Sequence, residues 1–148
     1  MNNIDQEMKH NIRLWNENTV TPCPNEGKHM ICNICDIQKI EILSDLSKIA
    51  DIIDIICQYN GYNATQSTYN NKREEDGGCT LMYILTDGYH LSIHTFPEKR
   101  SIAFDLYTSS NQYSNCDYNF ILIYEFLVEV FEAGVFTSTY NIMIREFE

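Results

Sequence analysis

Residues 89–98 read YHLSIHTFPE, and residues 101–108 read SIAFDLYT. In both stretches apolar and polar residues alternate, which is typical of β-strands that bury one face. Pro97 separates these two predicted strands, and a third at residues 80–85 precedes them across the turn signal Asp87-Gly88. Three consecutive strands with short connections favour antiparallel pairing.

The sequence on either side of these strands adds two helices. Apolar residues at helical spacing predict amphipathic helices at residues 43–57 and 120–131, with Asn60-Gly61 and Gly134 as their stop signals. The remaining strands are predicted at residues 28–35, 62–69 and 135–144, with loops at 70–78 and 109–117. Two helices cannot cover both faces of such a sheet. We therefore expect both on one face, in an α+β two-layer α/β sandwich.

The first 26 residues differ from the rest of the chain. They are polar, carry Pro22 and Pro24, and precede the regular pattern that begins at residue 27. We interpret residues 1–26 as an N-terminal arm and residues 27–148 as one domain. Leu14 and Trp15 are the residues expected to anchor the arm. The open face of the sheet needs a cover, which is either this arm or a partner.

The charge excludes some classes of partner. The chain has 148 residues, with 10 Lys and Arg against 21 Asp and Glu, so its formal net charge is −11. Binding to a nucleic-acid backbone depends on Lys and Arg, and binding to an anionic membrane depends on a basic amphipathic stretch. Neither is expected here. The polar start has no signal-peptide pattern, and we predict a cytoplasmic protein.

The six cysteines are predicted to be reduced thiols. They are Cys23, Cys32, Cys35, Cys57, Cys79 and Cys116. Cys23, His29, Cys32 and Cys35 lie close enough in sequence to suggest zinc. However, Cys32 and Cys35 lie within the strand predicted at residues 28–35, and positions i and i+3 of a strand point to opposite faces. No second C-x-x-C motif follows. Structural cysteines are favoured over a metal site.

Residues 89–98 and 103–108 together resemble the small prokaryotic S-adenosylmethionine (AdoMet) decarboxylases. In that family, Glu-Ser-His-Leu-Ser-Ile-His-Thr-Trp-Pro-Glu leads into Ala-x-Asp-x-Phe-Thr-Cys-Gly. Residues 27–30, GKHM, resemble the opening strand of the family and residues 61–69 its second strand, so the resemblance spans residues 27–145. It implies a sandwich that dimerises and binds AdoMet beside a strand end. It also implies a pyruvoyl cofactor that the chain would make by cleaving itself at the Glu-Ser bond.

The sequence departs from this family at the chemistry. Gly88-Tyr89 stands where the family has Glu-Ser, and Ser109 stands where it has a proton-donating Cys. The phenol of Tyr89 is on a ring rather than on Cβ, so Tyr89 cannot become a pyruvoyl group. By resemblance, His94 matches the processing histidine and Glu98 the ligand of the ribose. We therefore expect a pocket for AdoMet without the cofactor and without decarboxylation.

AdoMet can be cleaved without a cofactor, because its own carboxylate can displace the sulfonium group. We predict a lyase acting on AdoMet or on an adenylated AdoMet used in nucleotide signalling, which releases homoserine lactone and a methylthioadenosine-type product. The alternatives are a catalytically inactive regulatory subunit and an AdoMet sensor. A homo-oligomer, dimer or trimer, is expected.

The candidate residues follow from these readings. The predicted catalytic residues are Tyr89, His94 and Ser109, and the predicted substrate-binding residues are Glu98, Phe96, Ser92, Tyr69, Arg73, Lys99 and Arg100. The cations Lys72, Arg73, Lys99 and Arg100 could receive a phosphate group or could simply be solvated loop residues. No metal and no cofactor are expected.

Overall fold

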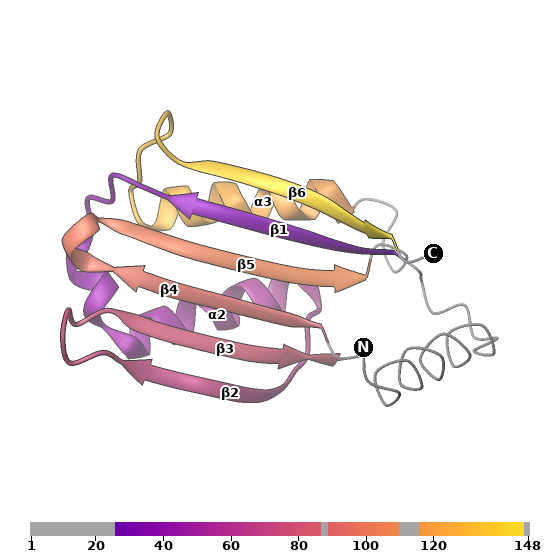
Figure 1. The fold of residues 1–148 in the computed structure, drawn as a ribbon, viewed down its shortest axis with the longest axis horizontal. Coiled ribbons are helices and arrows are strands. Elements are labelled where there is room, and N and C mark those ends of the chain that lie inside the picture. Colours follow the sequence, from indigo (N-terminus) through magenta and orange to yellow (C-terminus); the bar gives the residue numbers. More distant parts are fainter. Residues whose placement is uncertain (1–25, 87–88, 110–115, 147–148) are drawn as a thin grey trace, which may run out of the picture.

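The computed structural model describes residues 26–86, 89–109 and 116–146. They form one six-stranded antiparallel sheet with the strand order β2-β3-β4-β5-β1-β6. The strands are β1 (Glu26–Ile34), β2 (Ala64–Lys72), β3 (Cys79–Leu85), β4 (His90–Phe96), β5 (Ser101–Ser109) and β6 (Thr139–Glu146). The helices α2 (Leu46–Asn60) and α3 (Cys116–Val130) cover one face of the sheet (Figure 1). The predicted α+β two-layer sandwich is confirmed.

Short 3-10 helices and capping residues set the ends of α2 and connect β4 to β5. The helix η1 (Ile40–Ser44) precedes α2, and the Asp45 side chain caps α2 by accepting from the backbone N–H of Lys48 at 3.1 Å. Gly61 ends α2 with φ 67°, a left-handed conformation that glycine adopts without strain. A second 3-10 helix, η3 (Pro97–Lys99), connects β4 to β5. The predicted stop at Asn60-Gly61 is therefore confirmed.

The last strand begins later than predicted. Val135 and Phe136 are exposed, and β6 starts only at Thr139. The segment before β6 is a turn in which the backbone N–H of Ser138 donates to the carbonyl of Gly134. The buried Ser138 hydroxyl also accepts from the backbone N–H of Cys35 at 3.0 Å. The prediction of a strand from residue 135 was wrong because these contacts hold the apolar pair in a turn.

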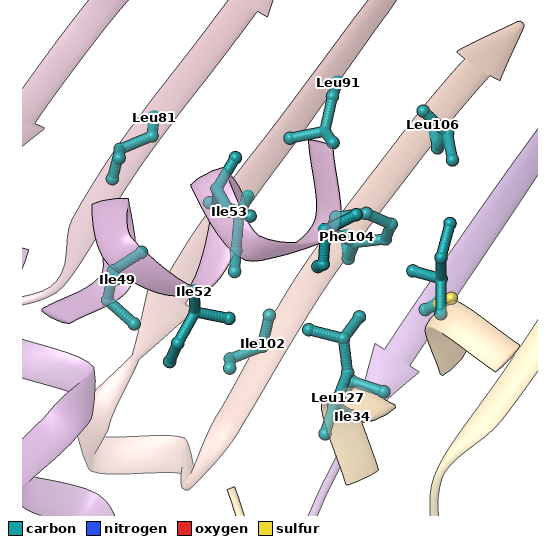
Figure 2. Packing of buried hydrophobic residues seen from close by; sticks show 14 of the residues in the cluster. Ile34, Ile49, Ile52, Ile53, Leu81, Leu91, Ile102, Phe104, Leu106 and Leu127 are labelled. Carbon is teal, nitrogen blue, oxygen red and sulfur yellow. The ribbon is translucent and has the colours of Figure 1, made fainter. Parts of the chain in front are cut away.

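The core lies between the sheet and the two helices. Alternate residues of the central strands, such as Leu91, Phe104 and Leu106, point toward Ile53 of α2 and Leu127 of α3 (Figure 2). Each of these five side chains has no exposed surface. The alternation that buries them sends the intervening residues of every strand to the opposite side of the sheet.

That opposite side is called the open face here. Among the described residues, no helix lies over it (Figure 1). The strand registers place His29 of β1, His90 of β4 and Tyr107 of β5 next to one another on this face. The predicted arm lies outside the described residues, apart from Glu26, which already belongs to β1. No described helix has the length and apolar character needed to cross a membrane.

Candidate functional site

Two groups of polar and aromatic side chains lie at opposite ends of β4, and Tyr89, in the first of them, is partly buried against the hydrophobic core. Tyr89 stands just before the strand, whereas Phe96 is its last residue. At about 3.3 Å per residue, these two positions are roughly 23 Å apart. The predicted catalytic residues are therefore separated: Tyr89 and Ser109 lie at one end of the sheet and His94 toward the other.

The first group, called the aromatic cluster, consists of His29, Tyr89, His90 and Tyr107. The ring of Tyr107 lies at its centre, 5.5 Å from the ring centroid of Tyr89, 5.6 Å from that of His90 and 6.1 Å from that of His29. The Tyr89–Tyr107 pair is edge-to-face, a favourable geometry for aromatic rings. A backbone hydrogen bond from Leu85 N–H to the Tyr89 carbonyl, at 2.7 Å, fixes Tyr89 at the start of β4.

A glycine makes room for this cluster. Gly27 stands on β1 beside β5, and a Cβ atom at this position would lie 2.5 Å from Cε2 of Tyr107. No side chain fits at that distance, so the Tyr107 ring can lie against the β1 backbone only because residue 27 is glycine. The GKHM stretch thus contributes both the space for Tyr107 and the imidazole of His29.

His29 is held between opposite charges. A guanidinium nitrogen of Arg145 donates to Nδ1 of His29 at 3.1 Å, and Nε2 of His29 lies 3.8 Å from Oδ1 of Asp105. Because Arg has only donors, Nδ1 must accept and the proton of the neutral ring lies on Nε2. Burial lowers the pKa of His29, the nearby Arg145 and His90 lower it further, and Asp105 opposes them. Among the described residues, the buried Nε2 atom has no hydrogen-bond partner.

The lowered pKa of His29 predicts a pH-dependent stability. The unfolded chain binds a proton at His29 near its ordinary pKa of 6.5, whereas the folded protein resists protonation. Above pH 6.5 the imidazole is neutral in both states, and the free energy of unfolding is unaffected by its titration. As the pH falls from 6.5 through the folded pKa, the unfolded chain takes up the proton first, so the free energy of unfolding decreases. Urea unfolding at pH 7.5 and 5.5 should show a larger loss of stability for the wild type than for His29→Gln. Equal losses would contradict this charge environment, which includes Asp105, Arg145, His90 and Tyr107.

The second group, called the arginine cluster, consists of Arg73, Asp76, Thr80, His94 and Phe96. Arg73 donates to both carboxylate oxygens of Asp76, at 3.1 and 3.3 Å, and to the hydroxyl of Thr80 at 2.8 Å. It also donates to the carbonyls of Cys79 and Thr95. The Thr80 hydroxyl lies 3.2 Å from Nδ1 of His94, and the Arg73 guanidinium stacks 5.1 Å from the Phe96 ring centroid.

These contacts give Arg73 a structural role. Its five N–H donors match the five contacts with Asp76, Thr80, Cys79 and Thr95, so a phosphate would have to displace a partner within the protein. Arg73 also lowers the pKa of the Asp76 carboxyl through its hydrogen bonds. The predicted phosphate contact at Arg73 therefore does not fit its geometry, and Arg73 joins the β2–β3 turn to the end of β4.

Removal of Arg73 should consequently destabilise the fold. Arg73→Met removes a donor from the carbonyls of Cys79 and Thr95, while the Asp76 carboxylate keeps the backbone N–H of Gly78, and we expect a loss of about 2–3 kcal/mol in the free energy of unfolding. Lys99→Met is the matched control, because Lys99 is exposed and lies 5.9 Å from the same Phe96 ring centroid. Denaturant unfolding of both variants measures the effect. A similar, small loss in both would show that Arg73 is not structural.

The other predicted residues are more dispersed. Ser92 is buried in the middle of β4, opposite Asp105 on β5 and Met82 on β3. Glu98, Lys99 and Arg100 are exposed in η3 and the following turn. The structure describes only the backbone of Tyr69, which pairs with Met82, and of Ser109, which pairs with Gly27.

The cysteine and histidine candidates for zinc are separated by the fold. Cys32 is fully buried on the helix side of β1, whereas His29 lies on the open face of the same strand. Among the described residues, no group of three or more His, Cys, Asp or Glu side chains lies close enough to hold a metal ion. Cys23, the fourth candidate, lies outside the described residues. Cys32, Cys35, Cys57 and Cys79 are free thiols, and burial raises the pKa of Cys32 to about 12.

Sequence reasoning missed Asp105 and Arg145 as site residues and considered His29 only as a zinc ligand. Each alternates onto the open face of its strand, but their mutual contact depends on the β1–β5 and β1–β6 registers. His29 and Asp105 are 76 positions apart in the chain. The available signal was the run GKHM, which places a polar histidine between Gly27 and a core methionine.

The comparisons agree with the fold. Residues 28–142 match the sequence profile of the family described as S-adenosylmethionine decarboxylase. Among solved structures, the chain is similar to the adenosylmethionine decarboxylase from Aquifex aeolicus VF5, with 16% identity and a TM-score of 0.67 over 82% of this chain and 92% of that chain. None of the curated protein sequences matches it. Because the profile covers most of the chain and the fold agrees, this protein belongs to the S-adenosylmethionine decarboxylase family.

Proposed function

We propose that this protein is a cofactor-independent lyase that cleaves AdoMet, or an adenylated AdoMet, at the aromatic cluster. In this reaction a carboxylate oxygen of the substrate attacks its own Cγ, and the Cγ–sulfur bond breaks. The electron pair of that bond goes to sulfur, so the positive charge on sulfur is lost. The products are homoserine lactone and a neutral methylthioadenosine-type thioether. No external proton, oxidant or reductant is needed.

The observation that carries the proposal is the identity and position of Tyr89. The decarboxylases of this family use a pyruvoyl group derived from serine, and Tyr89 stands at the position that the motif gives to this serine. Its Cβ bears an aromatic ring, so it has no hydroxyl to eliminate. Cys79 and Thr80 are poor substitutes, because both are buried within the continuous strand β3. The residues present do not fit a pyruvoyl group, and no step is assigned to one.

The aromatic cluster suits the reaction that remains. Tyr89 and Tyr107 keep water away from the attacking carboxylate, which raises its reactivity. Asp105, whose side chain is 37% exposed, holds the α-ammonium group, because that charge persists from substrate to lactone. His29 offers its unpaired Nε2–H to the substrate. Ser109 lies at the same end of the sheet, next to Gly27. Holding the substrate in its reactive conformation is the main task of the site.

The ribose contact requires a second copy of the chain. Glu98 lies two residues beyond Phe96, the last residue of β4. The length of β4 therefore separates Glu98 from Tyr89 by more than one AdoMet molecule can span. If Glu98 binds the ribose of an AdoMet held at Tyr89, the two residues come from different copies. The proposal then includes a homo-oligomer with its open faces turned toward each other. Lys99 and Arg100, exposed beside Glu98, then lie where a phosphate attached to the ribose would be.

The proposal is tested by incubating the purified protein separately with AdoMet and with AdoMet adenylated on its ribose. Formation of the matching methylthioadenosine-type product identifies the preferred substrate, and Lys99→Met with Arg100→Met should reduce cleavage of the adenylated form only. Intact mass should show one full-length chain. Tight binding without turnover would instead support a sensor. No binding, together with activation of a co-expressed decarboxylase, would support a regulatory subunit, and cleavage of the chain before Tyr89 would overturn the proposal.

A further inference from the structure

The helix layer contains an apolar groove on the side away from the candidate site. It lies between the last turns of α2 and the first turns of α3, and its volume is about 720 Å³. Ile55 and Tyr59 of α2 and Leu122 and Phe126 of α3 are among the residues that line it. Three of them are unusually exposed for apolar side chains: Ile55 at 40%, Leu122 at 43% and Tyr59 at 85%. Large exposed apolar surfaces of this kind commonly bind another segment or chain.

We propose that this groove, called the helix groove, is occupied by residues 4–15 of the same chain. The first argument is where the described chain begins. β1 starts at Glu26, beside the end of β5, where Gly27 pairs with Ser109. From this end of β5 the chain continues to α3. The end of α2 leads to the start of β2 at the same end of the sheet (Figure 1). The N-terminal segment therefore enters the domain at the end where the helix groove lies.

The second argument is the length and pattern of that segment. From Trp15 to Glu26 there are 11 residues, which span up to about 36 Å when extended and easily reach from the sheet to the helix layer. Ile4, Met8, Ile12 and Trp15 follow one another at intervals of four, four and three residues. On a helix this spacing places them on one face, which is the pattern of an amphipathic helix that docks in an apolar groove.

The third argument is the covalent link to β1. Asp5 and Glu7 balance Lys9 and Arg13, so residues 4–15 carry no net charge and are not repelled by the exposed acids of α2 and α3. Because the segment is tethered to β1, its local concentration at the helix groove is high, which favours the same chain over a separate partner.

Trp15 is the only tryptophan of the chain, so its fluorescence reports directly on this contact. The full-length wild type should show blue-shifted emission and weak quenching by acrylamide, relative to the same chain unfolded in urea. Leu122→Glu, in the helix groove, should shift the emission to that of the unfolded chain and increase quenching. Val135→Glu, an exposed apolar residue outside the helix groove, should leave both unchanged. Circular dichroism checks that both variants keep the fold.

Several results would overturn the inference. One is wild-type emission equal to that of the unfolded chain, and another is emission that Leu122→Glu does not change. Protection of Trp15 that disappears on dilution, together with dissociation of an oligomer, would assign the helix groove to the segment of another copy. A change of oligomeric state in Leu122→Glu, with Trp15 unaffected, would show that the groove joins two domains. None of these results depends on lyase activity.

Discussion

Asp105→Asn is expected to lower kcat/KM for AdoMet cleavage by roughly 10- to 100-fold, because it removes the carboxylate assigned to the α-ammonium group. A hydrogen bond to a charged group contributes about 1.5–3 kcal/mol, and each 1.4 kcal/mol corresponds to a factor of ten. Asp105 lies on the open face, 3.8 Å from Nε2 of His29 and on the strand that carries Tyr107. Asparagine keeps the shape of the side chain and removes only its charge.

Ligands that differ by one feature separate the possible roles of Asp105. S-adenosylhomocysteine keeps the ammonium group but has a neutral sulfur, and methylthioadenosine lacks the amino-acid part altogether. Asp105→Asn should weaken the binding of AdoMet and S-adenosylhomocysteine and leave methylthioadenosine unaffected, as measured by calorimetry. Asp54→Asn, on the exposed surface of α2, is the matched control. Weakened binding of AdoMet alone would place Asp105 at the sulfonium, and equal weakening of all three would indicate a structural role.

Phe104→Ala is expected to have the largest effect on stability, a loss of about 3–5 kcal/mol in the free energy of unfolding. Phe104 has no exposed surface and lies on β5 among Ile53, Leu91 and Ile102 (Figure 2). Truncation leaves a cavity in the core beneath β5, a strand that is paired with β4 on one side and with β1 on the other. Urea denaturation measures the loss.

Phe104→Leu is the control for this prediction. It keeps most of the apolar volume and should cost less than half as much as Phe104→Ala. Because Phe104 and Asp105 point to opposite faces of the same strand, the leucine variant should retain the activity of the folded protein. A loss below about 1 kcal/mol in Phe104→Ala would contradict the position of Phe104 at the centre of the core.

The fold could be predicted from local patterns because apolar and polar residues alternate along the central strands. Leu91 and Ile93 have no exposed surface, as their spacing indicates, and the predicted second helix corresponds to α3. The start of β6 could not be predicted, since Val135 and Phe136 have apolar side chains typical of a strand. What holds them in a turn is the contact of Ser138 with Cys35, 103 positions away in sequence. Such contacts leave no periodic signal.

The site was only partly predictable for the same reason. The motif pointed to Tyr89 and His94 as parts of one catalytic site, although a strand that contains both positions places them toward opposite ends of β4. The grouping of positive charge drew attention to Arg73, although the acceptors that occupy this side chain, at Asp76, Thr80 and Thr95, become visible only in three dimensions. Positive charge in a sequence does not show whether its donors are free.

The most direct test of the central claim uses AdoMet labelled with ¹⁴C at its carboxyl carbon. A cofactor-independent lyase keeps this carbon in the product, so the label should remain in solution as homoserine lactone, or homoserine after its hydrolysis, together with an equal amount of methylthioadenosine. Tyr89→Ala should reduce both products in parallel. Release of the label as carbon dioxide would show that the chain is a decarboxylase after all and would contradict the account.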